Sequence, residues 1–532
     1  MKTIIISLFI ICTIFLAQKQ SIGQQFIEND TIWASDTVRI YNDIVVENQA
    51  TLQIDPGIYV EFQDNFSLTV FGKIKARGTI NDTIVFTVNN AILIDDTTTH
   101  LGGWGGIRLL SNENDTSIFE YCKFTYGKAV DPGAFWGDPH NEDNKGGAIY
   151  INKYGHFRAN NCTFYHNRAN YAGGGIYVNE CKTLKIINNC FKYNSAYFIG
   201  GGIFIESSVY SLIYNNLFYL NESFYVSPSG FGGGAGSGLA LYDNAVVYSN
   251  LFFNNNSVNG ALYESSYNSF ISNNISANNM GTGMVFAGWD HGVSKLINNT
   301  IVNNKSYIPG GCGILFFGDN AIMRNNIVSG NTFHLEGIDP IQVWTPREVK
   351  ADFAYSCNPD EAIYYQGEGN IQDDPQFVNP TPGAGPDYDG LSADWSLLDS
   401  SPCVNTGTPD TSGLNLPATD LLGNPRIYGI RIDMGAIENQ TVVGLPENLL
   451  VNARVQVSPN PFGQSFKVIS PGREKISSFR LFNQKGQQIG METLMPMDQI
   501  LVFDLGYQPP GLYLLVTRFE DGTSETTKLV KY

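Results

Sequence analysis

Charged residues are scarce in this sequence of 532 residues, and basic residues are scarcer than acidic ones. Charged side chains make up 15% of the chain, with 32 Lys and Arg against 50 Asp and Glu, and the formal net charge is −18. Binding to phosphate backbones requires clustered Lys and Arg, so this balance argues against a nucleic-acid partner. We interpret the acidity as favouring solubility. An acidic face that binds cations is the alternative.

Long apolar runs are absent after residue 23. No later stretch reaches the roughly 18 apolar residues that a membrane-spanning helix needs. Residues 1–23 combine Lys2, an apolar run over residues 4–17 and the small residues Ser21 and Gly23. This order predicts a secretory signal peptide. We therefore expect an exported protein without a transmembrane segment.

Several motifs of common enzymes are also missing. The chain contains no CxxC pair, P-loop, dinucleotide-binding fingerprint or nucleophile elbow. The absence of paired cysteines argues against a structural zinc site. No sustained helical period occurs in residues 26–438, so we expect no helical domain there.

What the sequence does contain is a repeat. A shift of 27 residues places GGAIYI (146–151) on GGGIYV (173–178), and a second shift of 27 reaches GGGIFI (200–205). Such a repeat cannot bury its own core and must stack on its neighbours. The pattern predicts an all-β solenoid, a parallel β-helix whose strands lie about 4.8 Å apart. Residues 149, 176 and 203 should be vertical neighbours.

A second series of residues recurs between these strands. Its members are Asn161-Cys162, Asn189-Cys190, Asn216-Leu217, Asn250-Leu251, Asn274-Ile275, Asn299-Thr300 and Asn326-Ile327. Asn tolerates the left-handed backbone of a sharp corner, and stacked amides can bond along the coil axis as a ladder. Cys162 and Cys190 fill the same place in this alignment, and Cys122 resembles it one enlarged turn earlier. We interpret these cysteines as buried thiols, with a disulfide as the alternative.

The segment before residue 120 has a rhythm of its own. ATLQIDPGIYVEF (50–62) and SLTVFGKIKARGTI (67–80) alternate apolar and polar residues, and GGWGGIRLL (102–110) follows. This order, followed by the Asn and Gly repeats, resembles secreted right-handed parallel β-helix proteins of the pectate-lyase-like superfamily over residues 35–335. The resemblance implies a β-helix over residues 24–367 and leaves the activity open.

Residues 368–438 break the repeat. EGNIQDDPQFVN, DYDGLSADWSLLDSSPCVNTG and DLLGNPRIYGIRIDMGAIE resemble the choice-of-anchor block that closes β-helices on bacterial surface proteins. We expect this block to cap the solenoid, because an uncovered last turn exposes core and strand edges. Its acidic residues have turn and capping roles in this interpretation, with a calcium site as the alternative. They are Asp373, Asp374, Asp387, Asp389, Asp420, Asp433 and Glu438.

After a linker at residues 439–450, the sequence pattern changes in residues 451–532. Short alternating strands separated by PNP, KG, PPG and DG predict a small Ig-like antiparallel β-sandwich. The motifs resemble the type A C-terminal sorting domain of the type IX secretion system. The matching residues are Pro459, Asn460, Pro461, Gly486, Gly511, Lys528 and Lys531. The resemblance implies the type IX machinery as partner, export across the outer membrane, and a mature protein on the cell surface or released.

Catalytic candidates are few. Polysaccharide lyases on the resembled fold use a calcium-binding acidic cluster, an Arg or Lys base, and WiDH-like and RxPxxR-like segments. Here FAGWDHGV carries Asp290 and His291 but lacks the intervening residue and has no RxPxxR beside it. We interpret Asp290 and His291 as a polar corner, with catalysis as the alternative.

The long insertion at residues 129–147 is the second candidate, because long loops on rigid scaffolds often carry function. Its catalytic candidates are Asp138, Glu142, Asp143 and Lys145, and the ligand-binding candidates are Trp136 and His140 in the loop, with Tyr165 nearby. A solvated polar loop is the alternative. Exposed aromatics are predicted to line nearby turns: Tyr154, Tyr165, Tyr171, Tyr193, Tyr197 and Phe198.

These observations favour a monomeric, non-enzymatic protein with a binding or structural role and a glycan ligand. The alternative is a polysaccharide lyase or glycoside hydrolase that acts on acidic polysaccharide, with calcium as its cofactor. An enzyme would require the loop acids to converge with a base such as Lys145, Lys153 or Arg158.

Overall fold

The computed structural model describes residues 24–133, 138–225, 233–266, 268–288, 293–308, 310–317, 320–345, 350–360, 367–441, 455–469, 476–483, 487–493, 500–506 and 508–531. The chain divides into two compact units, Met1–Val443 and Gly444–Tyr532. We describe each unit separately.

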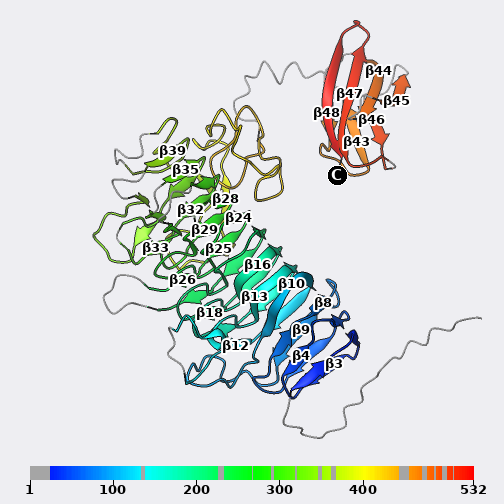
Figure 1. Ribbon diagram of the computed structural model, residues 1–532. Coiled ribbons are helices and arrows are strands. Elements are labelled where there is room, and N and C mark those ends of the chain that lie inside the picture. Colours follow the sequence, from blue (N-terminus) through cyan, green and yellow to red (C-terminus); the bar gives the residue numbers. More distant parts are fainter. Residues whose placement is uncertain are drawn as a thin grey trace, which may run out of the picture. The chain divides into compact units, whose positions relative to one another are not determined.

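The first unit is a parallel β-helix whose coils stack one above another (Figure 1). Each coil contributes strands to columns of parallel neighbours. The first column contains β1 (Gln25–Ile27), β4 (Ile44–Val46), β7 (Leu68–Val70), β10 (Ile107–Glu120), β13 (Ile149–Asn160), β16 (Ile176–Ile187), β19 (Ile203–Ile205), β23 (Leu239–Leu241), β27 (Leu262–Glu264), β30 (Met284–Phe286), β34 (Ile314–Phe316) and β38 (Val343–Trp344).

The second column joins the first through the long strands β10, β13 and β16. Its other members are β2 (Thr31–Trp33), β5 (Thr51–Ile54), β8 (Lys73–Arg77), β20 (Ser211–Tyr214), β24 (Ala245–Tyr248), β28 (Phe270–Ser272), β31 (Ser294–Ile297), β35 (Asn320–Arg324) and β39 (Lys350–Ala354).

The third column closes the coil. It contains β3 (Thr37–Ile40), β6 (Tyr59–Phe62), β9 (Ile84–Val88), β11 (Cys122–Thr125), β14 (Thr163–Tyr165), β17 (Cys190–Lys192), β21 (Leu217–Tyr219), β25 (Leu251–Phe253), β29 (Ile275–Ala277), β32 (Thr300–Val302) and β36 (Ile327–Ser329). Two-residue strands follow it: β12 (Lys128–Ala129), β15 (Arg168–Ala169), β18 (Ser195–Ala196), β22 (Glu222–Ser223), β26 (Asn256–Ser257), β33 (Lys305–Ser306) and β37 (Thr332–Phe333). A 3-10 helix at Glu142–Asn144 lies in the long insertion.

The register confirms the predicted repeat. Ile149 pairs with Ile176, and Ile176 pairs with Ile203. The residue after each of these Ile residues, namely Tyr150, Tyr177 or Phe204, points outward, because side chains alternate along a strand. The interior is filled by aliphatic rows and by a ladder of stacked rings along the third column. This ladder includes Phe86, Phe124, Phe164, Phe191, Phe218 and Phe252.

A buried ladder of Asn amides runs beside the third column, as the recurring Asn residues predicted. Nδ2 of Asn216 donates to Oδ1 of Asn250 at 2.9 Å, and Nδ2 of Asn250 donates to Oδ1 of Asn274 at 3.0 Å. The same Oδ1 atoms accept the backbone N–H of the preceding rung. The rungs are Asn189, Asn216, Asn250, Asn274, Asn299 and Asn326. Each amide also donates to a strand carbonyl, so both N–H groups are used in every rung before Asn326, which donates to the carbonyl of Leu296.

The alignment at the start of this ladder was wrong by one residue. Cys162, not Asn161, lies beneath Asn189, because the backbone N–H of Cys162 donates to Oδ1 of Asn189. Cys190 consequently pairs with Thr163 and points outward, so Cys162 and Cys190 do not stack. Cys122 is one residue before Lys123, which pairs with Thr163, and this places Cys122 beneath Cys162 as predicted. All seven described cysteines are free thiols.

A second buried ladder, which was not predicted, follows the other end of the third column. Its rungs are Asn167, Asn194, Asn221, Asn255, Asn279, Asn304 and Asn331, and Gln342 ends it. The residue before each rung turns the corner at positive φ. His166, Tyr193 and Leu220 do so in the middle coils, at φ values of 54°, 59° and 56°.

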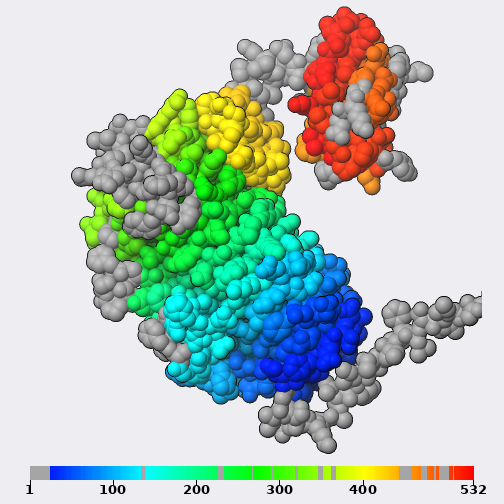
Figure 2. All heavy atoms as spheres, in the orientation of Figure 1, coloured from blue at the N-terminus to red at the C-terminus, as the bar shows by residue number. Residues whose placement is uncertain are grey.

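Residues 367–441, which we name the flank block, lie along the side of the later coils. They contain β40 (Phe377–Asn379), β41 (Asp394–Leu397) and a 3-10 helix at Gly390–Ser392. Trp395, Leu397 and Met434 of the block pack on Ile275 and Val302 of the third column. Figure 2 shows the yellow atoms of the block against the green atoms of these coils. Most of the block therefore covers a lateral face, whereas sequence analysis placed all of it as a cap on the end. Only its first residues continue the stack, because Ile371 pairs in parallel with Cys357 of the last described coil.

Corner asparagines fix the block. Nδ2 of Asn254 donates to the carbonyl of Tyr388 at 2.8 Å, Nδ2 of Asn273 to that of Thr419 at 3.1 Å, and Nδ2 of Asn298 to that of Asp433 at 2.8 Å. These asparagines are at positive φ, which turns their side chains away from the coil. Where two asparagines are consecutive, as in Asn273-Asn274, the first thus turns the corner and binds the block. The second belongs to the internal ladder.

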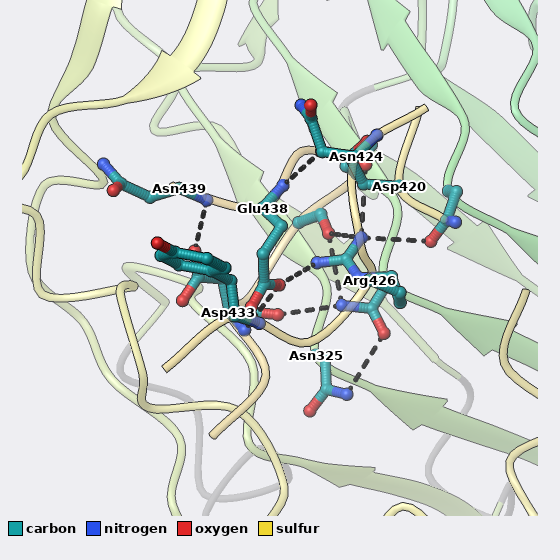
Figure 3. A network of polar contacts seen from close by, with 12 residues as sticks. Asn325, Asp420, Asn424, Arg426, Asp433, Glu438 and Asn439 are labelled. Carbon is teal, nitrogen blue, oxygen red and sulfur yellow. Dashed lines mark hydrogen bonds and ion pairs between the residues drawn. The ribbon is translucent and has the colours of Figure 1, made fainter. Parts of the chain in front are cut away.

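A buried ion pair holds the end of the block (Figure 3). Nη2 of Arg426 lies 2.7 Å from Oε2 of Glu438, and Nη1 of Arg426 donates to Oδ1 of Asn273 on the coil. Asp433 accepts the backbone N–H groups of Asn405 and Asn439. Burial raises the pKa of Asp433 to about 7, and the neighbouring Glu438 carboxylate adds to this.

The second unit contains two small antiparallel sheets, as predicted. One sheet contains β42 (Gln456–Ser458), β43 (Ser465–Ile469) and β46 (Ile500–Asp504). The other contains β45 (Gln488–Thr493), β44 (Ile476–Asn483), β47 (Gly511–Phe519) and β48 (Ser524–Lys531). Their apolar faces share one core, with Phe466, Phe479 and Phe503 at its centre.

Candidate functional site

The outer face of the first column carries two aligned rows of side chains, which we name the outer strip. The first row is Arg108, Tyr150, Tyr177, Phe204, Ala240 and Tyr263, each paired with the next across neighbouring strands. The second row is Asn152, Asn179, Glu206 and Tyr242. The strip exists because the repeat places equivalent outward-facing residues of successive coils directly above one another. Neighbouring residues in a row are about 4.8 Å apart along the coil axis.

The first row is largely buried beneath the turns that precede each strand. Tyr150 and Tyr177 stack with ring centroids 5.2 Å apart, and Tyr177 meets Phe204 at 5.7 Å. The second row is more open. Glu206 is exposed, Tyr242 is 46% exposed, and Asn152 and Asn179 are half-buried. Nδ2 of Asn179 donates to Oδ1 of Asn152 at 3.0 Å. The second row of the strip therefore presents amides, a carboxylate and an aromatic ring to solvent, beside the largely buried aromatic residues of the first row.

Lys145 from the long insertion joins this strip. Its ammonium donates to the hydroxyl of Tyr177 at 3.2 Å and lies 4.8 Å from the centre of the Tyr177 ring. The hydroxyl of Tyr177 donates in turn to Glu206. Lys145 is 7% exposed. The three groups thus form a chain from a buried ammonium to a carboxylate at the surface.

Burial is the largest cause of the pKa shifts of Lys145, Tyr171 and Tyr177. Burial lowers the pKa of Lys145 from its ordinary value, and the carboxylates Glu206 and Glu142 oppose this. Burial raises the pKa of Tyr177, and its hydrogen bond to Glu206 adds to the rise. Burial also raises the pKa of Tyr171, beside Lys145, to about 12. At neutral pH these phenols are therefore hydrogen-bond donors.

Arg108 closes one end of the strip. Its guanidinium lies 4.5 Å from the centre of the Tyr150 ring and donates to the carbonyl of Glu142 at 2.6 Å. The carboxylate of Asp143 lies 3.9 Å from Nη2 of Arg108. Arg108 and Asp143 also line a hollow of about 280 Å³, together with His100 and Asp131. Glu142 and Asp143 are thus brought to the strip, as the insertion hypothesis required.

The other predicted residues of the insertion make fewer contacts with the outer strip. Asp138 accepts the backbone N–H of His140 at 2.9 Å, and His140 is exposed. Asp138 is near enough to Lys145 to favour its charged form. Trp136 lies outside the described residues, as do Asp290 and His291.

Several predicted partners lie elsewhere. Tyr165 is on the third column, where its ring lies 5.6 Å from that of Tyr193, so it does not share a site with the insertion. Arg158 is on the second column beside Glu120. Tyr154 is fully buried and bonds to Ser117, so its predicted exposure was wrong. The positive φ of Lys153, 53°, interrupts the alternation of side chains directly before Tyr154, which faces the core.

The acidic residues of the flank block bind backbone and Arg426. Oδ1 of Asp420 accepts the N–H groups of Leu422 and Asn424, and Glu438 pairs with Arg426. Within the described ranges, no group of three or more His, Cys, Asp or Glu side chains is arranged to hold a metal ion.

Sequence analysis missed the central members of the strip, namely Tyr150, Tyr177 and Glu206. The signal for the tyrosines was present, because GGAIYI, GGGIYV and GGGIFI place an aromatic residue at the same outward position. Glu206 had no such signal, because a carboxylate occurs there in one coil alone of those that form the second row.

Comparison with known families agrees with the fold. The family model described as "Right handed beta helix region" matches residues 26–261 and 147–333, which together cover more than half of the chain. A search of curated proteins gave no match. Among the described residues, no helix is both long and apolar enough to cross a membrane.

Proposed function

Because this chain belongs to the right-handed β-helix family, we propose that it is an exported protein whose outer strip binds polysaccharide. The observation that carries this proposal is the register of Asn152, Asn179, Glu206 and Tyr242. These side chains repeat at steps of about 4.8 Å along the coil axis. A polymer of regularly spaced hydroxyl groups can therefore meet amides and a carboxylate repeatedly, with an aromatic ring at one end.

Lys145, Tyr177 and Glu206 favour a second candidate, which is cleavage of the bound polymer. The loop acids Glu142 and Asp138 and the strip residue Glu206 lie near enough to Lys145 to favour its charged form, which supports this candidate. However, Lys145 is buried and already donates to Tyr177, so a substrate proton cannot reach its nitrogen without rearrangement. We therefore favour binding.

Binding is tested with the full chain and immobilised or soluble polysaccharides, both acidic and neutral. We expect Glu206→Gln and Tyr242→Ala to weaken binding roughly tenfold, which corresponds to about 1.4 kcal/mol each. Tyr210→Ala is the matched control, because Tyr210 is 44% exposed and outside the strip. Equal losses in all three variants would contradict the assignment. New reducing ends or unsaturated products that vanish in Lys145→Met would favour cleavage.

We also propose that residues 451–532 direct export through the type IX route. Among the described residues matched to the sorting domain, Asn460, Gly511, Lys528 and Lys531 gather at one place in the second unit, which supports this role; Gly486 lies outside the described residues. Nδ2 of Asn460 donates to the carbonyl of Lys528 at 2.7 Å, and Oδ1 of Asn460 accepts the N–H of Val530 at 2.9 Å. Gly511 pairs with Lys531. The motif between Pro459 and Pro461 thus holds the last strand.

Export is tested in a bacterium that has a type IX system. We expect the full chain to reach the medium or the cell surface, and a chain ending at residue 450 to accumulate in the periplasm. Asn460→Ala should reduce export, because the last strand loses two side-chain hydrogen bonds. Export of the truncated chain at the normal level would contradict the proposal.

A further inference from the structure

The flank block leaves part of the third column uncovered. In the middle coils, the residues in register with the covered face are Asn161, Thr163, Asn188, Cys190, Asn215 and Leu217, which we name the open flank. They line a hollow of about 350 Å³. Asn188 and Asn215 are exposed, and Asn161, Thr163, Cys190 and Leu217 are half-buried. Their counterparts Asn273, Asn298 and Asn325 in the later coils are buried beneath the block.

The covered face shows what such a surface binds. Nδ2 of Asn298 donates to the carbonyls of Asp433 and Gly435, at 2.8 and 3.2 Å. Oγ1 of Thr300 accepts the N–H of Ala436 at 2.9 Å. The carbonyl of Asn325, one coil further, accepts the N–H of Gly435 at 2.7 Å. A short segment that bends at Gly435 is therefore held by an Asn, a Thr two residues later and the backbone of the next coil.

The open flank repeats this arrangement. Thr163 is in the same strand position as Thr300 through an unbroken series of paired residues. Asn161 precedes Thr163 as Asn298 precedes Thr300, and both asparagines are at positive φ, 55° and 56°. Asn188 occupies the place of Asn325 in the next coil, with φ of 58° in both. The backbone geometry and the polar groups that hold Gly435 and Ala436 thus recur here.

Glycine has a specific role in the docked segment. A Cβ on Gly435 would lie 2.7 Å from Cδ1 of Ile327 and 2.8 Å from Oγ1 of Thr300, and its φ is +91°. The positive φ strains any residue that has a Cβ, so glycine is strongly favoured at this position. At the open flank the equivalent neighbours are Thr163 and Cys190.

We propose that the open flank binds a polypeptide segment of a partner protein that bends at a central glycine, in the manner of residues 433–437. The occupant is a polypeptide because the adjoining face, which continues into the open flank at Leu217 and Leu251, binds backbone N–H and C=O groups in pairs. The outer strip lies on a different column, so this inference is independent of the proposed polysaccharide binding.

The probe is a labelled peptide with the sequence of residues 431–439, Arg-Ile-Asp-Met-Gly-Ala-Ile-Glu-Asn, added to the full chain. We expect saturable binding that falls roughly tenfold, or by about 1.4 kcal/mol, in Thr163→Val, which loses one hydrogen bond. Binding should fall at least as much in Asn161→Asp, because the equivalent Asn298 amide donates to two carbonyls. Thr69→Val, a half-buried Thr on the first column, is the control and should bind normally. A peptide with Val in place of Gly435 should not bind.

A second readout uses Cys190, which is the half-buried thiol of the open flank. Saturating peptide should slow its alkylation, while the buried thiols remain unreactive and report an intact fold. The proposal is overturned by no binding up to millimolar peptide, by equal binding of the valine peptide, or by binding that leaves Cys190 unprotected. Protection of Cys190 that rises with protein concentration in the absence of peptide would also overturn it, in favour of a second copy of this chain.

Discussion

The first coils and the later coils are held together by different kinds of interaction. Between residues 24 and 116, every buried side chain described is apolar, and the first buried polar one is Ser117. From Asn167 onward, buried amides line both ends of the third column. Strands of the third column also shorten, from four or five residues in β3, β6 and β9 to three in the later coils. Shorter strands leave more backbone groups at the corners, and side chains must satisfy these groups.

At the surface of the early coils, carboxylates satisfy the backbone N–H groups at the corners. Oδ1 of Asp43 accepts the N–H of Ser67 one coil away, at 2.8 Å. A carboxylate only accepts, whereas an amide both accepts and donates. An amide can therefore pass the same contact on to the next coil, and a carboxylate cannot. This difference explains why the ladder of the later coils is continuous and is made of Asn.

The largest effect is expected from breaking one rung of the ladder. Asn250→Ala removes the acceptor of the Asn216 N–H groups and the donor to Asn274 and Ile213. Several buried polar groups lose a partner at about 1–3 kcal/mol each, so the free energy of unfolding should fall by about 5 kcal/mol. Urea denaturation measures this change. Asn215→Gly, an exposed corner residue at positive φ, should cost less than about 1 kcal/mol. Equal costs would remove the distinction between ladder and corner.

Loss of the Arg426 guanidinium should be slightly less costly and should be local. Arg426→Met leaves Glu438 as an unpaired buried carboxylate and should cost about 4 kcal/mol. Hydrogen exchange should rise in the flank block and in the coils that carry Asn273 and Asn298. Amides of β5 and β8 should be unchanged, because the described contacts of the block lie on later coils, at Asn254, Asn273 and Asn298. A uniform rise would mean that the two regions unfold together.

A buried carboxyl makes the later coils sensitive to pH. Glu264 is 1% exposed and accepts hydrogen bonds from Ser266 and Ser294. Burial raises its pKa from 4.5 to about 7. The folded state therefore binds a proton more tightly than the unfolded state, so this stabilisation is present below about pH 4.5 and is lost as the pH rises to about 7.

The expected size of this effect is about 3 kcal/mol between these two pH values. It is measured as the difference in unfolding free energy between the native chain and Glu264→Gln, whose amide stays uncharged. The difference should favour the native chain at acidic pH and shrink as the pH rises. A difference that is constant with pH would contradict the account.

The smallest effect is expected at the surface of the early coils. Asp43→Ala removes the acceptor of Ser67 and should cost about 1 kcal/mol, because the freed N–H can bond to water. A loss as large as that of Asn250→Ala would show that carboxylates and amides are equivalent in this fold.

The repeat allowed the parallel register to be predicted, because Ile149, Ile176 and Ile203 are separated by equal intervals. The first ladder was predicted from the same periodicity, with a slip of one residue where Cys162 replaces an Asn. The second ladder was missed, since the residue before each rung varies among His166, Tyr193 and Leu220. The path of the flank block was not predictable, because Asn254 and Asn298 meet Tyr388 and Asp433 across more than 130 residues. Glu206 was missed because a single carboxylate has no period.

The central claim is that the asparagines directly after the corners of the coils belong to a satisfied internal ladder. Residue-resolved hydrogen exchange of the native chain tests it directly. The backbone N–H groups of Asn189, Asn216, Asn250 and Asn274 lie at turns, yet each donates to the Oδ1 of the next rung. The account predicts that they exchange as slowly as the central amides of β17 and β25. Exchange at the rate of ordinary exposed turns would contradict it.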